Sequence, residues 1–299
     1  MSSAEIQPWD DNQVMDDDRS RRELTEGLFR QRRAYLGDDV FLWDGPHDNT
    51  AHDLIDAEIW HTTFDLPTDV LLRTTDNNGQ MIDDMHSQGL AWLDALPLDD
   101  TLWPFFHDAY MDVLDEFQAA PFIAAHGFYR QAGAGLRNAL EIMARAARFA
   151  VRHDEPGYKA WRTGTAVPPP FGNCSDLLRQ TPAGIAIDTQ LGGAGLFGVN
   201  PNGVLRDLYA SLSNFSHAHP GSTNGDIWQS NGPVYRFEAF TTFWTLYCDT
   251  SIACFALLKM SDPAAKGTDA LLDHAASTLP GAHWHGLAEA TVRALSLDS

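Results

Sequence analysis

Basic residues are scarce in this chain. Its 299 residues include 20 Lys and Arg against 41 Asp and Glu, which gives a formal net charge of −21. Such a balance repels nucleic-acid phosphates at long range and favours solubility. Residues 1–125 carry 27 acidic and 7 basic side chains, whereas residues 126–299 carry 14 and 13. Nearly all of the excess acidity therefore belongs to the first two fifths of the chain.

Cysteine is also rare, with only Cys174, Cys248 and Cys254. Three thiols cannot all pair, and their spacing does not match that of metal ligands, so we predict buried thiols in a reducing cytoplasm. The first 18 residues lack the apolar core of a signal peptide, which favours the same location. Histidine pairs such as His283 and His285 lack the ligand number of a metal site, so we predict no metal or other cofactor.

Long apolar runs are missing except for residues 239–258, AFTTFWTLYCDTSIACFALL. This run reaches the length that spans a membrane. Asp249 near its centre, with Arg236 and Glu238 just before it, would be costly in lipid. We therefore predict a buried central helix and no membrane partner.

Strand signals are few. Apolar and polar residues alternate, although weakly, only in residues 184–190, GIAIDTQ, which could therefore form a short strand. Apolar residues elsewhere recur at steps of three and four, the period of amphipathic helices. The sequence therefore predicts an all-α helical bundle with four core helices and an additional N-terminal helical layer. The core helices are expected at 101–120, 126–153, 204–217 and 233–260.

The same patterns divide the chain into four parts. We expect a flexible acidic leader (1–18), an acidic helical layer (19–100), the bundle (101–260) and a helical tail (261–299). Between the core helices, the proline-rich stretch 155–173 predicts a break. The glycine-rich stretch GGAGLFG is similar to a phosphate-binding loop, but it lacks a following Lys-Ser or Lys-Thr pair and a βαβ context. We predict that it is a flexible loop that could act as a lid.

The predicted helix 126–153 carries a charged stripe. Successive members stand seven, four, four, three and four residues apart, which places them on one helical face. These six residues, which we call the arginine stripe, are Arg130, Arg137, Glu141, Arg145, Arg148 and Arg152. Three interpretations stay open: a solvated face, a contact with the acidic first 125 residues, or a site for phosphate or an RNA backbone. On the same helix, Gly133 and Gly135 would allow a neighbouring helix to approach closely.

A second polar face lies on the core helix that follows. Arg206, Ser213 and His217 succeed one another at steps of seven and four, so Ser213 and His217 are neighbours one turn apart. The helix dipole would favour the charged form of His217 at the helix end. Pro220 and Gly221 then end the helix. Helix capping and the edge of an active site both fit this pattern.

Four stretches together resemble a known family. LRNALEIMARAARF on one helix, AWRTG after it, LRDLYASLSNFSHAHPG and the long aromatic helix are similar to helical proteins of the HEPN class, in its abortive-infection-like branch. The resemblance covers about residues 101–260. It implies a bundle, commonly dimeric, that cleaves RNA or binds nucleotides in defence or stress systems.

The usual catalytic motif of that class is an arginine followed four to six residues later by a histidine. In this chain Ser211, Leu212 and Ser213 stand four to six positions before His217, so the arginine is missing. An arginine of the stripe could take its place in space.

These patterns lead to a predicted site with two groups of residues. The predicted phosphate- or ligand-binding residues are Arg137, Arg145 and Arg206. The predicted catalytic residues are His217 as acid or base, with Ser213 and Glu141 to orient the reacting groups. The predicted function is binding of RNA or a small phosphate ligand, with metal-independent ribonuclease activity as its enzymatic form.

An alternative function stays open. In it the same cluster is a buried polar network in a non-catalytic structural or interaction module. A homodimer, or a protein partner that contacts the acidic N-terminal layer, would then be the binding event.

Overall fold

The computed structural model describes residues 63, 65–94, 103–192, 195–198, 203–216, 233–261 and 282–296. The chain separates into two compact units, Met1–Ala57 and Glu58–Ser299, and every described residue belongs to the second. The predicted leader and most of the predicted acidic layer lie outside the described residues. The division into four parts therefore stays a prediction.

The described part of the chain is all-α, as predicted, and no strand occurs within it. Three of the four long helices predicted for the bundle are found within a few residues of their expected bounds, and the fourth extends five residues further. That these four alone form the core stays a prediction. The described helices are α4 (Leu66–Asp94), α5 (Trp103–Ala125), α6 (Tyr129–Val151), α7 (Glu155–Arg162), α8 (Phe171–Arg179), α9 (Pro182–Leu191), α10 (Val204–Ser216), α11 (Phe237–Ser261) and α13 (Ala282–Ser296).

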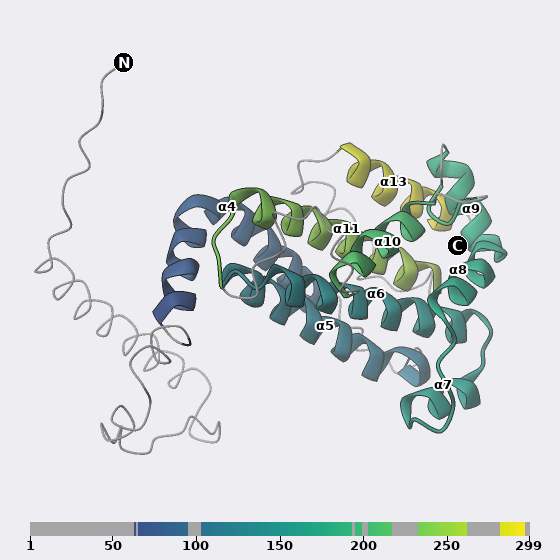
Figure 1. Cartoon of the computed structure of the whole chain (residues 1–299). Helices are drawn as coiled ribbons and strands as arrows, with labels where there is room; N and C mark the ends of the chain where they lie inside the picture. Colours follow the sequence, from purple (N-terminus) through teal and green to yellow (C-terminus); the bar gives the residue numbers. More distant parts are fainter. Residues whose placement is uncertain are drawn as a thin grey trace, which may run out of the picture. The chain divides into compact units, whose positions relative to one another are not determined.

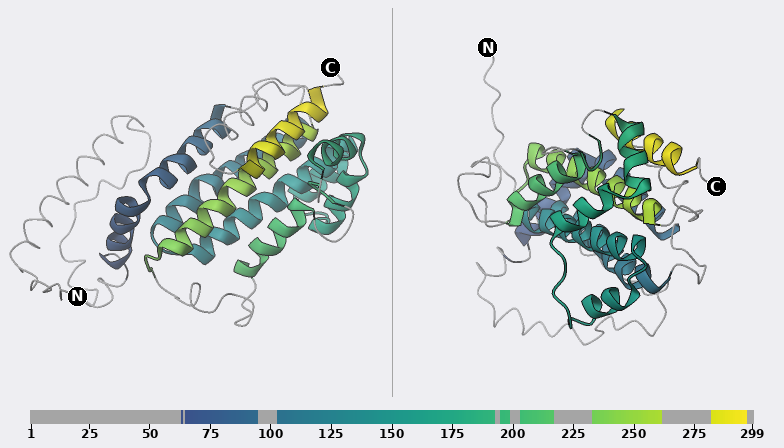
Figure 2. Two further views of the ribbon diagram at one scale, coloured as in Figure 1. Left: turned by 90° about the horizontal axis from the view of Figure 1, so that it is seen from above. Right: turned by 90° about the vertical axis from the view of Figure 1, so that its right-hand side faces the viewer.

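Helix α6 is the central helix of the described part of the chain and contacts α5, α7, α8, α10 and α11. It packs against α5, α10 and α11 along its length and against α8 near its end (Figure 1). The short helices α7, α8 and α9 gather at one end of these longer helices, and α13 runs along α11 (Figure 2). This arrangement places one face of α6 next to α8 and α10, where the arginine stripe lies.

A group of stacked aromatic rings joins α4, α5 and α11. The Trp92 ring stacks on Phe255 with centroids 4.0 Å apart and on Phe117 at 5.3 Å. The indole N–H of Trp92 donates to Ser251 Oγ at 3.1 Å, and the Tyr110 hydroxyl donates to the Trp92 carbonyl. Such a buried ring contributes both apolar area and preferred ring geometry. Helix α4, predicted as part of an outer layer, thus contributes a fully buried side chain to the core.

Helix α11 is buried on every side over its second half, which explains its nearly continuous apolar sequence. Among the described helices, none combines the length and the apolar character that crossing a membrane requires.

Two segments differ from the sequence-based expectation. Residues 182–191 form helix α9, so the predicted strand at 184–190 is wrong. Thr181 Oγ1 accepts from the Gly184 N–H at 3.0 Å, and Pro182 occupies the first turn, a strong helix start that outweighs weak alternation. The predicted break contains helix α7, which begins where Asp154 accepts from the Gly157 N–H at 3.0 Å.

Helix α5 continues past its predicted end, through Pro121 to Ala125. Proline has no N–H, so the Phe117 carbonyl loses its usual donor four residues later. The Tyr247 hydroxyl of α11 lies 3.3 Å from that carbonyl oxygen and 3.2 Å from the Met85 carbonyl oxygen, so the two carbonyls share its one proton. Tertiary contact therefore compensates for the proline.

The two glycines of α6 allow close approach, as predicted. A Cβ on Gly133 would lie 2.6 Å from the Phe215 ring of α10, and a Cβ on Gly135 would lie 2.7 Å from Glu116 Oε2 of α5. Both distances are shorter than a real Cβ contact, so only glycine fits at these positions without a shift of the neighbours.

Candidate functional site

The arginine stripe follows from the amphipathic sequence of α6. Leu136, Leu140 and Met143 are fully buried against the neighbouring helices. The charged residues occupy the opposite edge, one helical turn after another. They meet α8, α10 and the segment that connects α7 to α8.

Glu141 is the centre of the site. Its Oε1 lies 3.0 Å from Arg137 Nη2, and its Oε2 lies 2.7 Å from Arg145 Nη2. The exposed fractions of the three side chains are 23% for Arg137, 15% for Glu141 and 16% for Arg145. These are charge-assisted contacts in a largely water-excluded place, where removing one partner costs more than at an exposed pair because a buried charge is left unpaired.

Tyr209 of α10 completes the coordination of Glu141. Its hydroxyl donates to Glu141 Oε1 at 2.9 Å and accepts from Arg137 Nη2, also at 2.9 Å. The Arg137 guanidinium carbon lies 5.1 Å from the centre of the Tyr209 ring. On its other side the ring stacks on Phe171 of α8, with centroids 4.0 Å apart and an interplanar angle of 6°. One side chain therefore links α6, α8 and α10.

Arg145 connects the site to the proline segment before α8. Its Nε donates to the Pro169 carbonyl at 3.2 Å while its Nη2 contacts Glu141. The buried Cys174 thiol lies near the same carbonyl, with the sulfur 3.9 Å from it. Burial raises the pKa of this thiol to about 11, although Arg148 and Arg145 act in the opposite direction. The thiol is thus protonated at neutral pH, and Cys174 is not a nucleophile of this site.

The cluster carries more positive charge than its one carboxylate can balance. Arg137, Arg145 and Arg148 stand on adjacent turns beside Glu141, which leaves two unbalanced charges among these four residues. Burial opposes the charge on Arg137, but the Tyr209 hydroxyl and the Glu141 carboxylate raise its pKa overall. The Nε atoms of Arg137 and Arg148 are buried and have no hydrogen-bond partner among the described residues. The guanidinium groups of Arg137 and Arg148 therefore each hold a buried N–H that donates to no described residue.

The two ends of the stripe behave differently from its middle. Arg130 Nε donates to the Phe215 carbonyl near the end of α10, at 2.9 Å, and Arg152 is exposed where α6 ends. The partners described for Arg130, Arg137 and Arg145 lie at residues 141–215. Most of the acidic first 125 residues lie outside the described part of the chain, so a contact between them and the stripe stays a prediction.

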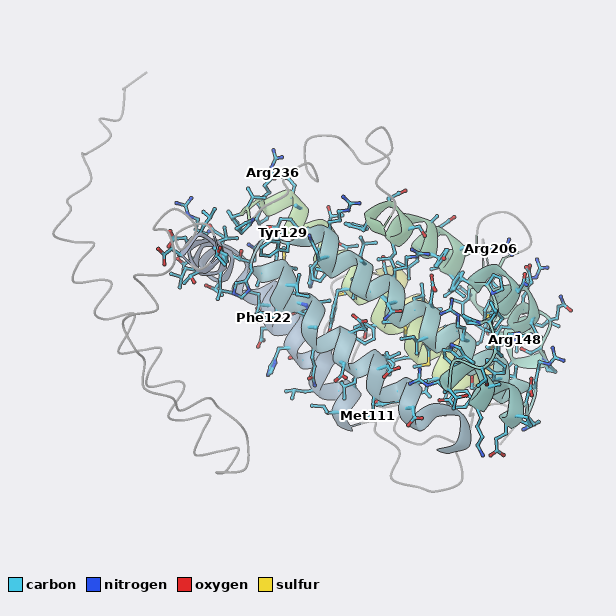
Figure 3. All side chains as sticks on the ribbon, turned by 60° about the horizontal axis from the view of Figure 1, so that its bottom comes forward. Met111, Phe122, Tyr129, Arg148, Arg206 and Arg236 are labelled. Carbon is cyan, nitrogen blue, oxygen red and sulfur yellow. The ribbon has the colours of Figure 1, made fainter. Side chains whose placement is uncertain are left out.

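Two predicted site residues occupy other places. The Arg206 guanidinium pairs with Asp176 of α8, whose same carboxylate oxygen also lies 3.9 Å from Arg179. Ser213 donates its hydroxyl to the Tyr209 carbonyl of its own helix at 2.7 Å. Arg206 and Arg148 lie at the same end of the helices in Figure 3, although they have different partners. His217 lies outside the described residues, so its predicted role stays a prediction.

Sequence reasoning missed Tyr209, which is the residue that joins the two predicted faces. The signal was available, because Tyr209 stands three residues after Arg206 and four before Ser213 and so lies on the same face of α10. What the sequence did not contain was the partner, since helical spacing does not tell which helices are neighbours.

The glycine-rich stretch also differs from its predicted flexible state where it is described. Gly195, Leu196, Phe197 and Gly198 are buried. The Asp188 carboxylate of α9 accepts from the backbone N–H groups of residues 196, 197 and 198, at 2.8, 3.0 and 3.1 Å. An internal carboxylate therefore occupies the N–H groups that a phosphate-binding loop would present.

Comparison with known proteins adds no relative to this description. No protein-family model, no curated protein and no solved structure matches the chain. The HEPN resemblance therefore stays a prediction, and the function has to be argued from the site alone. Among the described residues, no group of three His, Cys, Asp or Glu side chains is placed to hold a metal ion.

Proposed function

We propose that this protein binds a phosphate-bearing ligand on the face of α6 that Arg137, Arg145 and Arg148 form. The observation that carries the proposal is that two guanidinium groups, those of Arg137 and Arg145, share a single carboxylate, Glu141, while Arg148 follows Arg145 by one turn on the same face. Guanidinium groups recognise phosphate through paired N–H donors, and they keep their charge when partly buried.

Two features support an anion as the missing partner. The buried Nε atoms of Arg137 and Arg148 donate to no described residue, and unpaired buried donors cost stability unless a bound group that reaches them accepts. The chain as a whole is strongly acidic, so a site for an anion needs a local concentration of cations to overcome the long-range repulsion. The arginine stripe supplies that concentration.

The phosphate could belong to a small ligand or to an RNA backbone, and the chemistry of recognition is the same. In the enzymatic form of the proposal, His217 would act as acid or base on RNA held by these arginines. Arg206 is not part of the proposed anion site, because Asp176 already pairs with its guanidinium.

Thermal unfolding with added anions tests the binding. A ligand that binds only the folded state stabilises it by RT ln(1 + L/Kd), where L is the free ligand concentration, so the unfolding temperature rises with the logarithm of L once L exceeds Kd. We expect pyrophosphate or a short single-stranded RNA to stabilise the wild-type chain, and we expect Arg148→Gln to remove most of that shift. Arg293→Gln is the matched control, because Arg293 forms an exposed pair with Glu289 on α13. Equal shifts in both variants would refute the site.

Incubation with total RNA tests the enzymatic form. The wild-type chain and His217→Ala are incubated side by side without added metal. Cleavage by the wild type alone supports the assigned acid or base, and intact RNA in both tubes rejects the nuclease. Stabilisation by pyrophosphate but not by RNA would identify a small phosphate ligand.

A structural role is the second candidate, and one observation favours it. Glu141 receives three donors, two from arginines and one from Tyr209, which is a well-satisfied polar network between three helices. Glu141→Gln separates the two functions. In an anion site Glu141 competes with the ligand, so the variant should bind pyrophosphate more tightly while it unfolds more easily. In a purely structural network only the loss of stability should appear.

A further inference from the structure

A groove between α4 and α5 lies on a part of the protein that the proposed function does not use. It encloses about 390 Å³ and is lined mainly by apolar side chains of the two helices. Leu71, Ile82, Met85, Leu90, Leu93 and Phe122 are among them. The polar lining residues Thr75, His86 and Gln118 are few.

A residue of α11 contacts both helices that form the groove. The Tyr247 hydroxyl of α11 lies 3.2 Å from the Met85 carbonyl of α4 and 3.3 Å from the Phe117 carbonyl of α5. Trp92, which stacks on Phe117, fixes α4 to the same core. Both walls of the groove therefore contact the same buried side chain, Tyr247.

Three large apolar side chains that line the groove are exposed to solvent. Phe122 is 66% exposed, Leu90 47% and Leu93 43%, and all three line the groove. Phe122 projects from α5 at the edge of the helices (Figure 3). Single exposed apolar residues are ordinary, but three large ones around one concave surface are typical of a binding surface.

The charged residues of the two helices that form the groove are almost all acidic. Helices α4 and α5 carry five and four acidic residues, and Arg73 is their one Lys or Arg. Exposed Asp83 stands three residues before His86, and exposed Asp115 stands three before Gln118, so each carboxylate continues a stripe that lines the groove. An apolar groove with acidic residues beside it matches a partner that is apolar on one side and cationic on the other.

We propose that this groove, formed by α4 residues 71–93 and α5 residues 117–125, binds a basic amphipathic helix of a partner protein. The groove-lining residues 82–93 of α4 extend about 16 Å, which matches about three turns of a bound helix. Its apolar side chains, spaced three and four residues apart, enter the groove between Leu90 and Phe122, and its Lys and Arg side chains face Asp83 and Asp115.

A labelled synthetic peptide tests the proposal with the full chain. The probe is an 18-residue helix with Leu at steps of three and four and Lys elsewhere, and fluorescence anisotropy measures its binding. One control peptide has the same composition with Leu at alternate positions, and another has Glu in place of Lys. We expect each control peptide to bind at least ten times more weakly than the probe.

Variants of the chain locate the binding. Phe122→Ser should weaken binding of the probe at least tenfold. Leu90→Ser serves the same purpose if the Phe122→Ser variant does not fold. The matched control is Ile185→Ser, which removes another exposed apolar residue, 56% exposed, on α9. The double variant Asp83→Asn with Asp115→Asn should weaken binding and reduce its dependence on salt.

Three results would overturn the proposal. One is equal binding of the probe and the alternate-position peptide, which would show attraction to an acidic protein without a groove. A second is unchanged binding by both groove variants. A third is a dimer in analytical ultracentrifugation that Phe122→Ser converts to a monomer, because the groove would then be an interface between two copies of this chain.

Discussion

The Tyr209 hydroxyl lies 2.9 Å from Glu141 Oε1, so α10 donates a hydrogen bond to a carboxylate that belongs to α6. Because the same hydroxyl accepts from Arg137, a single oxygen contacts two charged residues of the arginine stripe.

Tyr209→Phe tests the energetic value of that oxygen. The ring and its stacking on Phe171 are kept, but Glu141 loses a donor and Arg137 loses an acceptor. We expect the free energy of unfolding in urea to fall by about 1–3 kcal/mol, the usual cost of leaving partly buried partners unpaired. Ser213→Ala is the control, because its hydroxyl bonds only within its own helix, and it should change stability by less than about 0.5 kcal/mol.

Gly133→Ala tests the close approach of α6 and α10. Alanine is the better helix former by about 1 kcal/mol, but its Cβ would lie 2.6 Å from the Phe215 ring. We expect net destabilisation of about 1–3 kcal/mol, because the two helices must separate. Gly172→Ala on α8 is the matched control, since nothing lies within 4 Å of its added Cβ, and it should be neutral or stabilising. A neutral Gly133→Ala would contradict the described helix contact.

Tyr247→Phe tests how α5 passes through Pro121. The Phe117 carbonyl would lose the hydroxyl proton that it shares with the Met85 carbonyl and that compensates for the missing proline N–H. We expect a loss of about 1–3 kcal/mol in chemical denaturation. In a Pro121→Ala background, the alanine N–H can donate to the same carbonyl, so Tyr247→Phe should cost less there. Equal costs in both backgrounds would show that the tyrosine acts through packing alone.

The buried Cys174 thiol predicts a pH dependence. Burial raises its pKa from an ordinary value of 9.0 to about 11, so the folded protein favours the protonated form. Its contribution to stability is complete below pH 9 and is lost as pH rises through 11. Unfolding measured from pH 8 to pH 11 should show a smaller slope in Cys174→Ala than in the wild type, after correction for the variant's lower stability at pH 8. Rapid reaction of the native thiol with a disulfide reagent at pH 8 would contradict this burial.

The core helices could be predicted because their information is local. In α6 the apolar residues Leu136, Leu140 and Met143 recur at steps of three and four, and a helix is the conformation that puts them on one side. Residues 184–190 show a weak apolar–polar alternation that predicts a strand, but they form part of helix α9. The helix-start signal of Thr181 as N-cap and Pro182 in the first turn is the stronger local signal.

The candidate site could be predicted only in part. The spacing of Arg137, Glu141 and Arg145 along one helix indicated their contacts, and the structure shows both ion pairs. The spacing of Arg206 did not indicate its partner, because Asp176 lies thirty residues away on another helix. Contacts between helices depend on which elements are neighbours, and helical spacing contains no information about that.

The sequence by itself determined that this protein is helical, that α6 has one charged edge, and that α11 is apolar enough to be buried. Each follows from the 3.6-residue period, which relates residues within one or two turns. Only the tertiary structure decided that Tyr209 meets Glu141, that Tyr247 replaces the missing donor at Pro121, and that α4 and α5 leave a groove between them. These depend on residues that are distant in the chain, and packing brings them together.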